Sequence, residues 1–259
     1  MGRANVWPKL NYSAKWAAVI LLAAALKLYY SSAGVDDLRW ILAPTAFLVE
    51  LTTGLGFYFE AHVGYMSIDR TFLIALPCSG VNFLIVAFLT LGLRRLLGDN
   101  VTWWSLGLAV VIAYLATIVA NTARISVAIQ LRDLAPSLDW LEPEDLHRLE
   151  GIAVYFAALL VLYFVDEWFG SGSRNCPLER TTHRLRRYLL PLSVYYAITL
   201  GIPIANGAHG QGWEFWRHSL FVVLAPIGLI WLAVGLRYAL SRGILVRRSQ
   251  VPKRGLWNE

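Results

Sequence analysis

The sequence predicts an all-α, polytopic membrane protein, folded as one transmembrane helical bundle with six to eight spans. Of its 259 residues, 57% are hydrophobic and 15% are charged, whereas soluble domains carry about 45–50% apolar and about 25% charged residues. One small core cannot bury that excess, so we expect lipid to solvate much of the surface. The 11 Trp and 12 Tyr are typical of aromatic belts at two membrane interfaces.

Long apolar segments separated by short polar linkers account for most of the chain. A spanning helix needs roughly 20 mostly apolar residues, and no repeat, low-complexity tract or soluble domain interrupts the series. We therefore expect a single integral membrane domain over residues 1–259. The candidate segments are 14–30, 41–59, 72–93, 103–129, 147–169, 188–205 and 216–240.

The net charge of +6 is gathered in basic clusters between the apolar segments. This pattern fits the enrichment of Arg and Lys in cytoplasmic loops better than it fits nucleic-acid binding. The clusters follow the third segment (Arg94 and Arg95), fill the linker 170–187 and follow residue 240, so these regions are expected in the cytoplasm. The start of the third segment and the loops 130–146 and 206–215 are then expected outside.

The second segment, 41–59, is a weak span because Glu50, Thr52 and Gly54 interrupt it. Basic residues before the first segment favour a cytoplasmic N-terminus, which would require the second segment to be re-entrant if the third is to start outside. The alternative is an outside N-terminus with both segments spanning.

A cysteine lies at the expected outer start of the third segment, in the run Pro77-Cys78-Ser79-Gly80. Proline is favoured at the first position of a helix, so we expect Cys78 in the first helical turn, where unpaired amides and the helix dipole favour a thiolate. The alternative is a buried cysteine that acts as a small apolar residue. Since Cys176 is the one other cysteine, neither a disulfide framework nor a zinc cluster is expected, and no cofactor or metal is implied.

An arginine and an asparagine lie near the expected outer end of the fourth segment. Placing Arg124 inside an apolar run costs about 2.5–3.5 kcal/mol on insertion scales, and Asn121, three residues earlier, shares its helical face. The alternative is an interfacial arginine whose head group reaches water.

A histidine opens the fifth segment. Pro143 and the acids after it mark a helix start, which places His147 in the second turn, where Glu144 or Glu150 could orient its imidazole. The alternative is an ordinary interfacial histidine. His209 in the loop 206–215 is a further possible pocket residue, because loops often carry function.

Together these segments supply a nucleophile, a base and a cation at one expected membrane depth. A thiolate that attacks a carbonyl, a histidine that transfers the proton and a positive group that stabilises the oxyanion are the components of covalent acyl transfer. The sequence therefore favours an enzyme of this kind.

Three short motifs occur in an order that matches a known family. They are Cys78-Ser79-Gly80, Asn121 to Arg124, and His147 to Gly151. Over about residues 60–170 the chain thereby resembles the exosortase/archaeosortase family of multi-span membrane proteins. The sequence Pro-Cys-Ser-Gly-Val-Asn-Phe is most similar to the exosortase K branch. Residues 188–240 fit as additional C-terminal helices.

The resemblance implies a cysteine protease or transpeptidase, with Cys78 as nucleophile, His147 as general acid/base and Arg124 as oxyanion stabiliser. Asn121 would support Arg124, and Ser79, Gly80 and Glu150 would be further supporting residues. Family substrates are proteins with a C-terminal motif, a transmembrane helix and a basic tail, whose acyl group passes to an acceptor that the sequence does not identify. The expected location is a bacterial cytoplasmic membrane, with the site on its extracytoplasmic side.

Two other classes of function stay open. A transporter or channel would use Arg124 and His147 to line a substrate path, and it predicts that Cys78→Ser is tolerated. A non-catalytic partner in envelope assembly predicts that Cys78, Arg124 and His147 all tolerate substitution.

Overall fold

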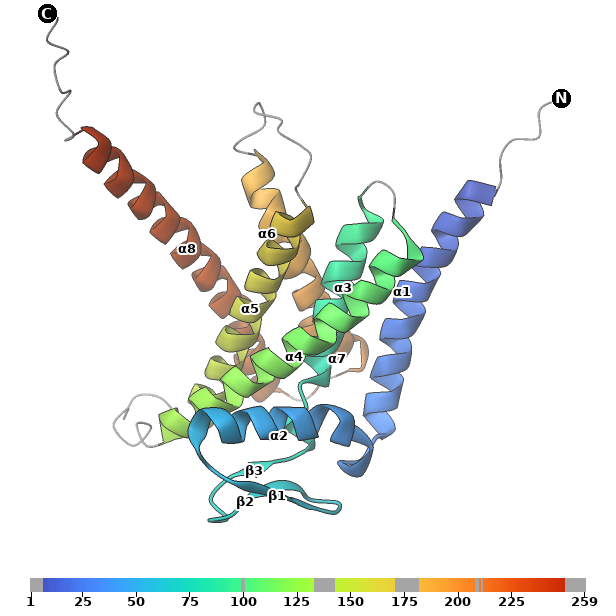
Figure 1. Cartoon of the computed structure of the whole chain (residues 1–259), viewed down its shortest axis with the longest axis vertical. Helices are drawn as coiled ribbons and strands as arrows, with labels where there is room; N and C mark the ends of the chain where they lie inside the picture. Colours follow the sequence, from blue (N-terminus) through green and yellow to red (C-terminus); the bar gives the residue numbers. More distant parts are fainter. Residues whose placement is uncertain are drawn as a thin grey trace, which may run out of the picture.

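The computed structural model describes residues 7–98, 101–132, 143–170, 182–207, 210 and 212–249. Within these residues, six helices are long and apolar enough to cross a membrane, which confirms the predicted polytopic helical bundle (Figure 1). Five spans lie on α1 (Trp7–Ser32), α3 (Val81–Leu96), α4 (Trp103–Arg132), α5 (Pro143–Gly170) and α8 (Trp213–Ser249). The remaining span combines α6 (Thr182–Tyr196), a π-helical turn (Ala197–Gly201) and α7 (Ile202–Ala205).

The spans alternate in direction, so the bundle has two distinct ends (Figure 1). At the upper end of Figure 1, called here the Arg94 end, α3 and α5 finish and α4 begins. At the lower end, called here the Cys78 end, α4 finishes and α3, α5 and α8 begin.

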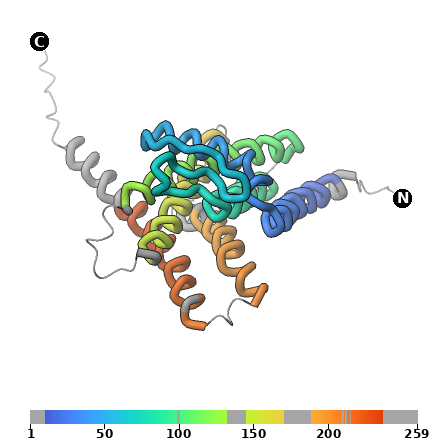
Figure 2. The backbone as a smooth tube through the Cα atoms, turned by 90° about the horizontal axis from the view of Figure 1, so that it is seen from below, coloured from blue at the N-terminus to red at the C-terminus, as the bar shows by residue number. Residues whose placement is uncertain are grey.

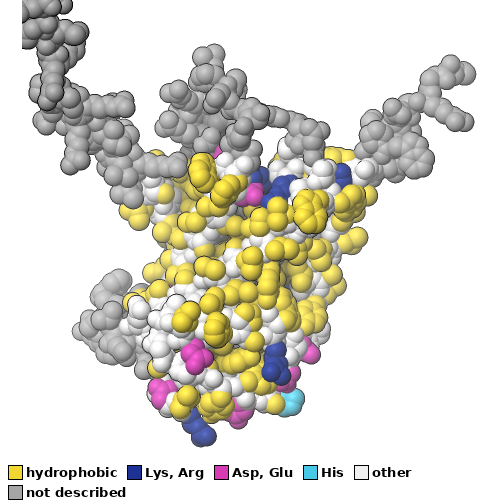
Figure 3. Space-filling model, in the orientation of Figure 1, with side chains coloured by type: hydrophobic (Ala, Val, Ile, Leu, Met, Phe, Trp, Pro, Cys, Tyr) yellow, Lys and Arg dark blue, Asp and Glu magenta, His cyan; other side chains and the backbone are white. Residues whose placement is uncertain are grey.

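Helix α3 is the centre of the bundle. It packs against α1, α4, α5 and α6, and most of its side chains are buried, among them Ile85, Ala87 and Leu91. By contrast, large apolar side chains such as Leu115 and Val161 are exposed on the outside of α4 and α5. Figure 3 shows hydrophobic side chains over the middle of the molecule, which is the surface that a bilayer would cover.

Helix α2 (Arg39–Thr53) lies across the Cys78 end (Figure 1). Its 15 residues give a length of about 22 Å, which is shorter than the ~30 Å hydrocarbon core. The buried face of α2 includes Leu42 and Val49. The helix packs mainly against α4. The helix of the predicted segment 41–59 is therefore not one of the six candidate spans, and it lies across the end of the bundle (Figure 1).

A small antiparallel sheet follows α2 and lies beneath it (Figures 1 and 2). It has the order β1-β2-β3, with β1 at Phe57–Glu60, β2 at Gly64–Ser67 and β3 at Leu73–Ile74. We predicted no strands here, because the aromatic residues of β1 read as part of an apolar segment. The alternation of half-buried and exposed residues along β1 is the period-two signal of a strand.

Candidate functional site

Cys78 lies between the sheet and the central helix. It ends the short 3₁₀ turn Leu76–Cys78, its N–H donates to the Ala75 carbonyl at 2.8 Å, and its side chain is half-buried. Cys78 thus lies in the opening turn of the candidate span Leu76–Leu96, as predicted, but this turn is a 3₁₀ turn and not the first turn of the α-helix itself. Gly80 adopts a left-handed conformation with φ of 72°, which separates the 3₁₀ turn from α3, and the helix begins at Val81.

Gly80 brings this turn close to α4. A Cβ atom at Gly80 would lie 3.1 Å from Asn121 Cγ and 3.2 Å from Thr117 Cγ2, so a larger residue here would crowd these two α4 side chains. Ser79 is fully buried, and its hydroxyl has no hydrogen-bond partner among the described residues. Ser79 is therefore a poor alternative to Cys78 as a nucleophile.

Asn121 connects α4 to the Cys78 turn. Its side chain is fully buried; Nδ2 donates to the Cys78 carbonyl at 2.5 Å, and Oδ1 accepts from the Tyr155 hydroxyl at 2.7 Å. We expected Asn121 to support Arg124, but the hydrogen bonds that the structure gives it go to the Cys78 backbone and to Tyr155.

Tyr155 is a site residue that our sequence analysis missed. Besides its bond to Asn121, its ring lies 5.4 Å from the Arg124 guanidinium and stacks on Phe83 at 5.0 Å. The available signal was spacing, because His147, Gly151 and Tyr155 recur every four residues and therefore share one face of α5. Tyr155 thus holds both Asn121 and Arg124 in place.

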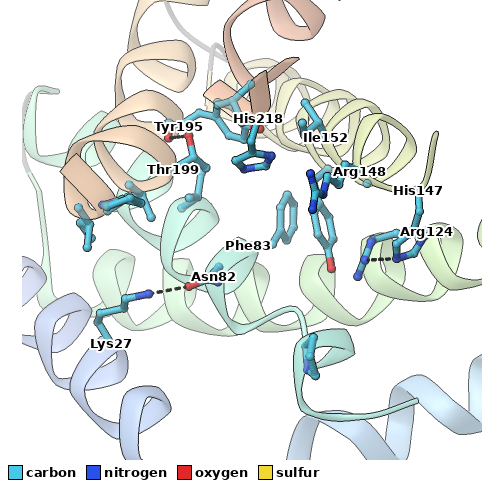
Figure 4. Close-up of a pocket in the computed structure, with 18 of the residues that line it drawn as sticks. Lys27, Asn82, Phe83, Arg124, His147, Arg148, Ile152, Tyr195, Thr199 and His218 are labelled. Atoms are coloured by element: carbon cyan, nitrogen blue, oxygen red, sulfur yellow. Dashed lines mark hydrogen bonds between the residues drawn. The ribbon is translucent and has the colours of Figure 1, made fainter. Parts of the chain in front are cut away.

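Arg124 and His147 meet across the α4–α5 contact. Their Nη2 and Nε2 atoms lie 3.3 Å apart (Figure 4). A Cβ atom on Gly151 would lie 3.0 Å from Arg124 Nε. The absence of a side chain at Gly151 therefore leaves space for the Arg124 side chain to pack against α5.

Glu150 lies beneath His147. Its Oε2 is 3.7 Å from His147 Nδ1, and its side chain is 4% exposed. Within the described part of the chain, neither of its carboxylate oxygens has a hydrogen bond. Of the two acids that we considered, Glu150 is adjacent to the imidazole, while the side chain of Glu144 is outside the described part.

A cavity of about 450 Å³ opens beside these residues. Its lining comes from α1, α3, α4, α5, α8 and the segment 195–206, and it includes Tyr155 as well as Arg124 and His147 (Figure 4). Pro77 lines the cavity, whereas its neighbour Cys78 does not. The structure thus brings Arg124, His147 and Glu150 together directly, and it joins Cys78 to them through Asn121 and Tyr155.

Helices outside the expected core of residues 60–170 also form this cavity. Lys27 of α1 lines it and donates to Asn82 Oδ1 at 3.0 Å (Figure 4), and Tyr195 and His218 contribute from α6 and α8. His218 is not among the site residues that we predicted from the sequence. His209, the other possible pocket residue, lies outside the described residues.

The cavity lining carries Lys27, Arg124 and Arg148 but no aspartate or glutamate among the described residues. In the same part of the chain, no three His, Cys, Asp or Glu side chains group as metal ligands would. What the arrangement offers is an imidazole and a guanidinium that line an internal space, with a half-buried thiol at the same end of the bundle. Compared with known proteins, the chain matches no family model, no curated protein and no solved structure.

Proposed function

We propose that this protein is an exosortase-type cysteine transpeptidase that cleaves the C-terminal sorting signal of exported proteins. The observation that carries the proposal is the convergence of Cys78, Arg124 and His147. Arg124 of α4 and His147 of α5 are in contact beside the cavity. Cys78 lies in the 3₁₀ turn at the same end of the bundle and is joined to them through Asn121 and Tyr155. The motif order that resembles the exosortase/archaeosortase family supports the same chemistry.

The side of the membrane follows from the distribution of basic residues. The Arg94 end holds Arg94 and Arg95, and the basic linker 170–187 joins the two helix termini there. Since cytoplasmic loops are enriched in Arg and Lys, the Arg94 end faces the cytoplasm and the Cys78 end faces outward. The proposed chemistry therefore occurs at the outer face.

In the first step, the Cys78 sulfur attacks the carbonyl carbon of the scissile peptide, and the thiol proton passes to His147. The carbon–nitrogen bond then breaks, and His147 returns the proton to the leaving amine, which yields a thioester on Cys78. An acceptor nucleophile, or water, attacks the thioester and releases the thiol. No direct hydrogen bond joins Cys78 to His147 among the contacts of the described residues, and such contacts often tighten only when substrate binds.

Arg124 is suited to stabilise the oxyanion that each attack produces. Its guanidinium lies 3.3 Å from His147 Nε2, which gives a fixed positive charge beside the proposed acid/base in a site partly shielded from water, where electrostatic stabilisation is strongest. Removing one oxyanion donor typically costs about 10²–10³ in rate.

The substrate class fits the location of the cavity at the end of a membrane bundle. A protein anchored by its own transmembrane helix would present the peptide just outside that helix at the depth of Cys78. Its basic tail would then remain on the cytoplasmic side, in agreement with the charge rule that orients the enzyme.

The deciding experiment co-expresses the protein with a candidate substrate that has a C-terminal motif, a transmembrane helix and a basic tail. Cys78→Ala and Cys78→Ser are expected to insert normally and to abolish processing, seen as loss of the shortened product on a gel. Cys176→Ala is the matched control and should process normally. Full processing by Cys78→Ala would refute the proposal.

Arg124→Lys separates this proposal from its competitors. Lysine keeps the charge but loses the planar fork of donors, so we expect processing to fall by about 10²–10³. A transporter would instead tolerate Cys78→Ser, and a non-catalytic assembly partner would tolerate changes at Cys78, Arg124 and His147.

A further inference from the structure

A second cavity, of about 780 Å³, lies at the Arg94 end, away from the proposed catalytic site. Figure 1 shows α4 and α5 diverging toward this end, with α3 between them. The cavity occupies this opening, because its lining comes from the end of α3, the start of α4 and the end of α5.

The polar part of the lining has more positive than negative charge. Arg94 and Arg95 both pair with Asp166, the latter at 2.9 Å, and Arg95 also donates to the Ser105 carbonyl. Two guanidiniums therefore share one carboxylate among the described lining residues. Their side chains remain 22% and 14% exposed, so each can still offer N–H groups to an anion.

The walls of the cavity are apolar, and several of their side chains are exposed on the outside of the bundle. Leu108, Val165 and Phe169 are exposed, and Ile112 and Leu162 are half-buried. In a membrane these walls lie within the bilayer, where an acyl chain is the natural neighbour. Exposed tryptophans at the same end, Trp103, Trp104 and Trp168, are typical of the depth at which lipid head groups begin.

We propose that this second cavity is a groove that binds a phospholipid with a net anionic head group. The phosphate lies at Arg94 and Arg95, and an acyl chain runs along the apolar walls of α4 and α5. A free phosphate would use the arginine pair alone, whereas the lipid uses both parts of the lining. A zwitterionic lipid carries an ammonium that cancels its phosphate, so the positive excess favours an anionic lipid.

The test uses the full chain, purified and stripped of lipid in detergent, then offered phosphatidylglycerol or phosphatidylcholine with the same acyl chains. Native mass spectrometry counts the lipid that each sample retains. We expect preferential retention of phosphatidylglycerol and a preference about fivefold lower for each arginine removed, in Arg94→Gln and in Arg94→Gln/Arg95→Gln. Arg70→Gln, an exposed arginine at the opposite end, is the matched control and should retain the preference.

A second variant keeps the test decisive if loss of the arginines disturbs folding. Val165→Trp leaves the ion pairs intact and fills the groove from an exposed position, so it should lower retention of phosphatidylglycerol while the thermal unfolding curve stays unchanged. Equal retention of the two lipids would overturn the proposal, as would normal retention by Val165→Trp. Displacement of phosphatidylglycerol by millimolar inorganic phosphate would overturn it too, because it would indicate a simple anion site.

Discussion

At the scale of single residues, the proposed site depends on one half-buried tyrosine that is assigned no chemical step. The Tyr155 hydroxyl fixes Asn121, and Asn121 holds the Cys78 carbonyl, while the Tyr155 ring lies against Arg124. One side chain thus orients both the cysteine turn and the cation. Because buried polar groups are costly without partners, these bonds also contribute to the stability of the fold.

Replacing Tyr155 by Phe tests this role. The ring and its stacking on Phe83 are kept, but the buried Asn121 oxygen loses its donor. We expect the free energy of unfolding to fall by about 1–3 kcal/mol, measured by denaturant titration in detergent, and processing by the folded fraction to slow. Tyr58→Phe, at an exposed strand position, should change stability by less than about 0.5 kcal/mol. Equal effects of the two variants would contradict the role assigned to Tyr155.

At the scale of elements, the position of Cys78 depends on how the sheet joins α3. The chain leaves β3, makes the 3₁₀ turn that ends at Cys78, and enters α3 through Gly80. Gly80 has two separate requirements: a left-handed backbone and close contact with Asn121. Gly54, which ends α2, shares the first requirement with φ of 75° but has no atom within 4 Å of its Cβ position.

This pair of glycines separates backbone strain from crowding. Gly54→Ala is expected to cost about 1–2 kcal/mol of unfolding free energy through its left-handed conformation alone, with processing unchanged. Gly80→Ala should cost more, because the added methyl also displaces Asn121, and processing should fall as the Cys78 turn moves. Both are measured by unfolding titration and by the processing assay. Matching costs for the two variants would show that close packing on Asn121 is unimportant.

At the scale of the whole molecule, the six candidate spans separate a basic end from the end that holds the site. Because α2 lies across the Cys78 end without crossing, α1 and α3 are consecutive spans, and the N-terminal start of α1 lies at the Arg94 end. In this arrangement a cytoplasmic start of α1 and the proposed outward location of Cys78 are compatible, whereas the sequence could reconcile the two only through a re-entrant segment.

Thiol labelling of intact cells tests this orientation. In a background without Cys78 and Cys176, Ile68→Cys adds a thiol at an exposed position of the Cys78 end, and Leu97→Cys adds one at an exposed position of the Arg94 end. A membrane-impermeant maleimide should label Ile68→Cys in intact cells, and Leu97→Cys only after permeabilisation. The reverse pattern would place the proposed site in the cytoplasm and would remove the basis for cleaving exported proteins there.

The sequence by itself determined that lipid solvates this protein, how many spans are possible, and which ends of the spans are basic. These properties depend on composition and on the length of apolar runs, which are local. It also identified Cys78, Arg124 and His147 as candidates, because a thiol, a cation and an imidazole are conspicuous in apolar segments. The contact between Arg124 and His147 agrees with their predicted common depth.

The tertiary structure alone decided which side chains complete the site. Tyr155 looked like an ordinary aromatic residue of a span, and His218 like an interfacial one, until packing brought them to the same cavity. The same holds for Lys27, which lies 55 residues before its partner Asn82. Contacts between distant segments depend on how helices cross and on where glycines let backbones approach, and neither property can be read from the hydropathy of a single segment.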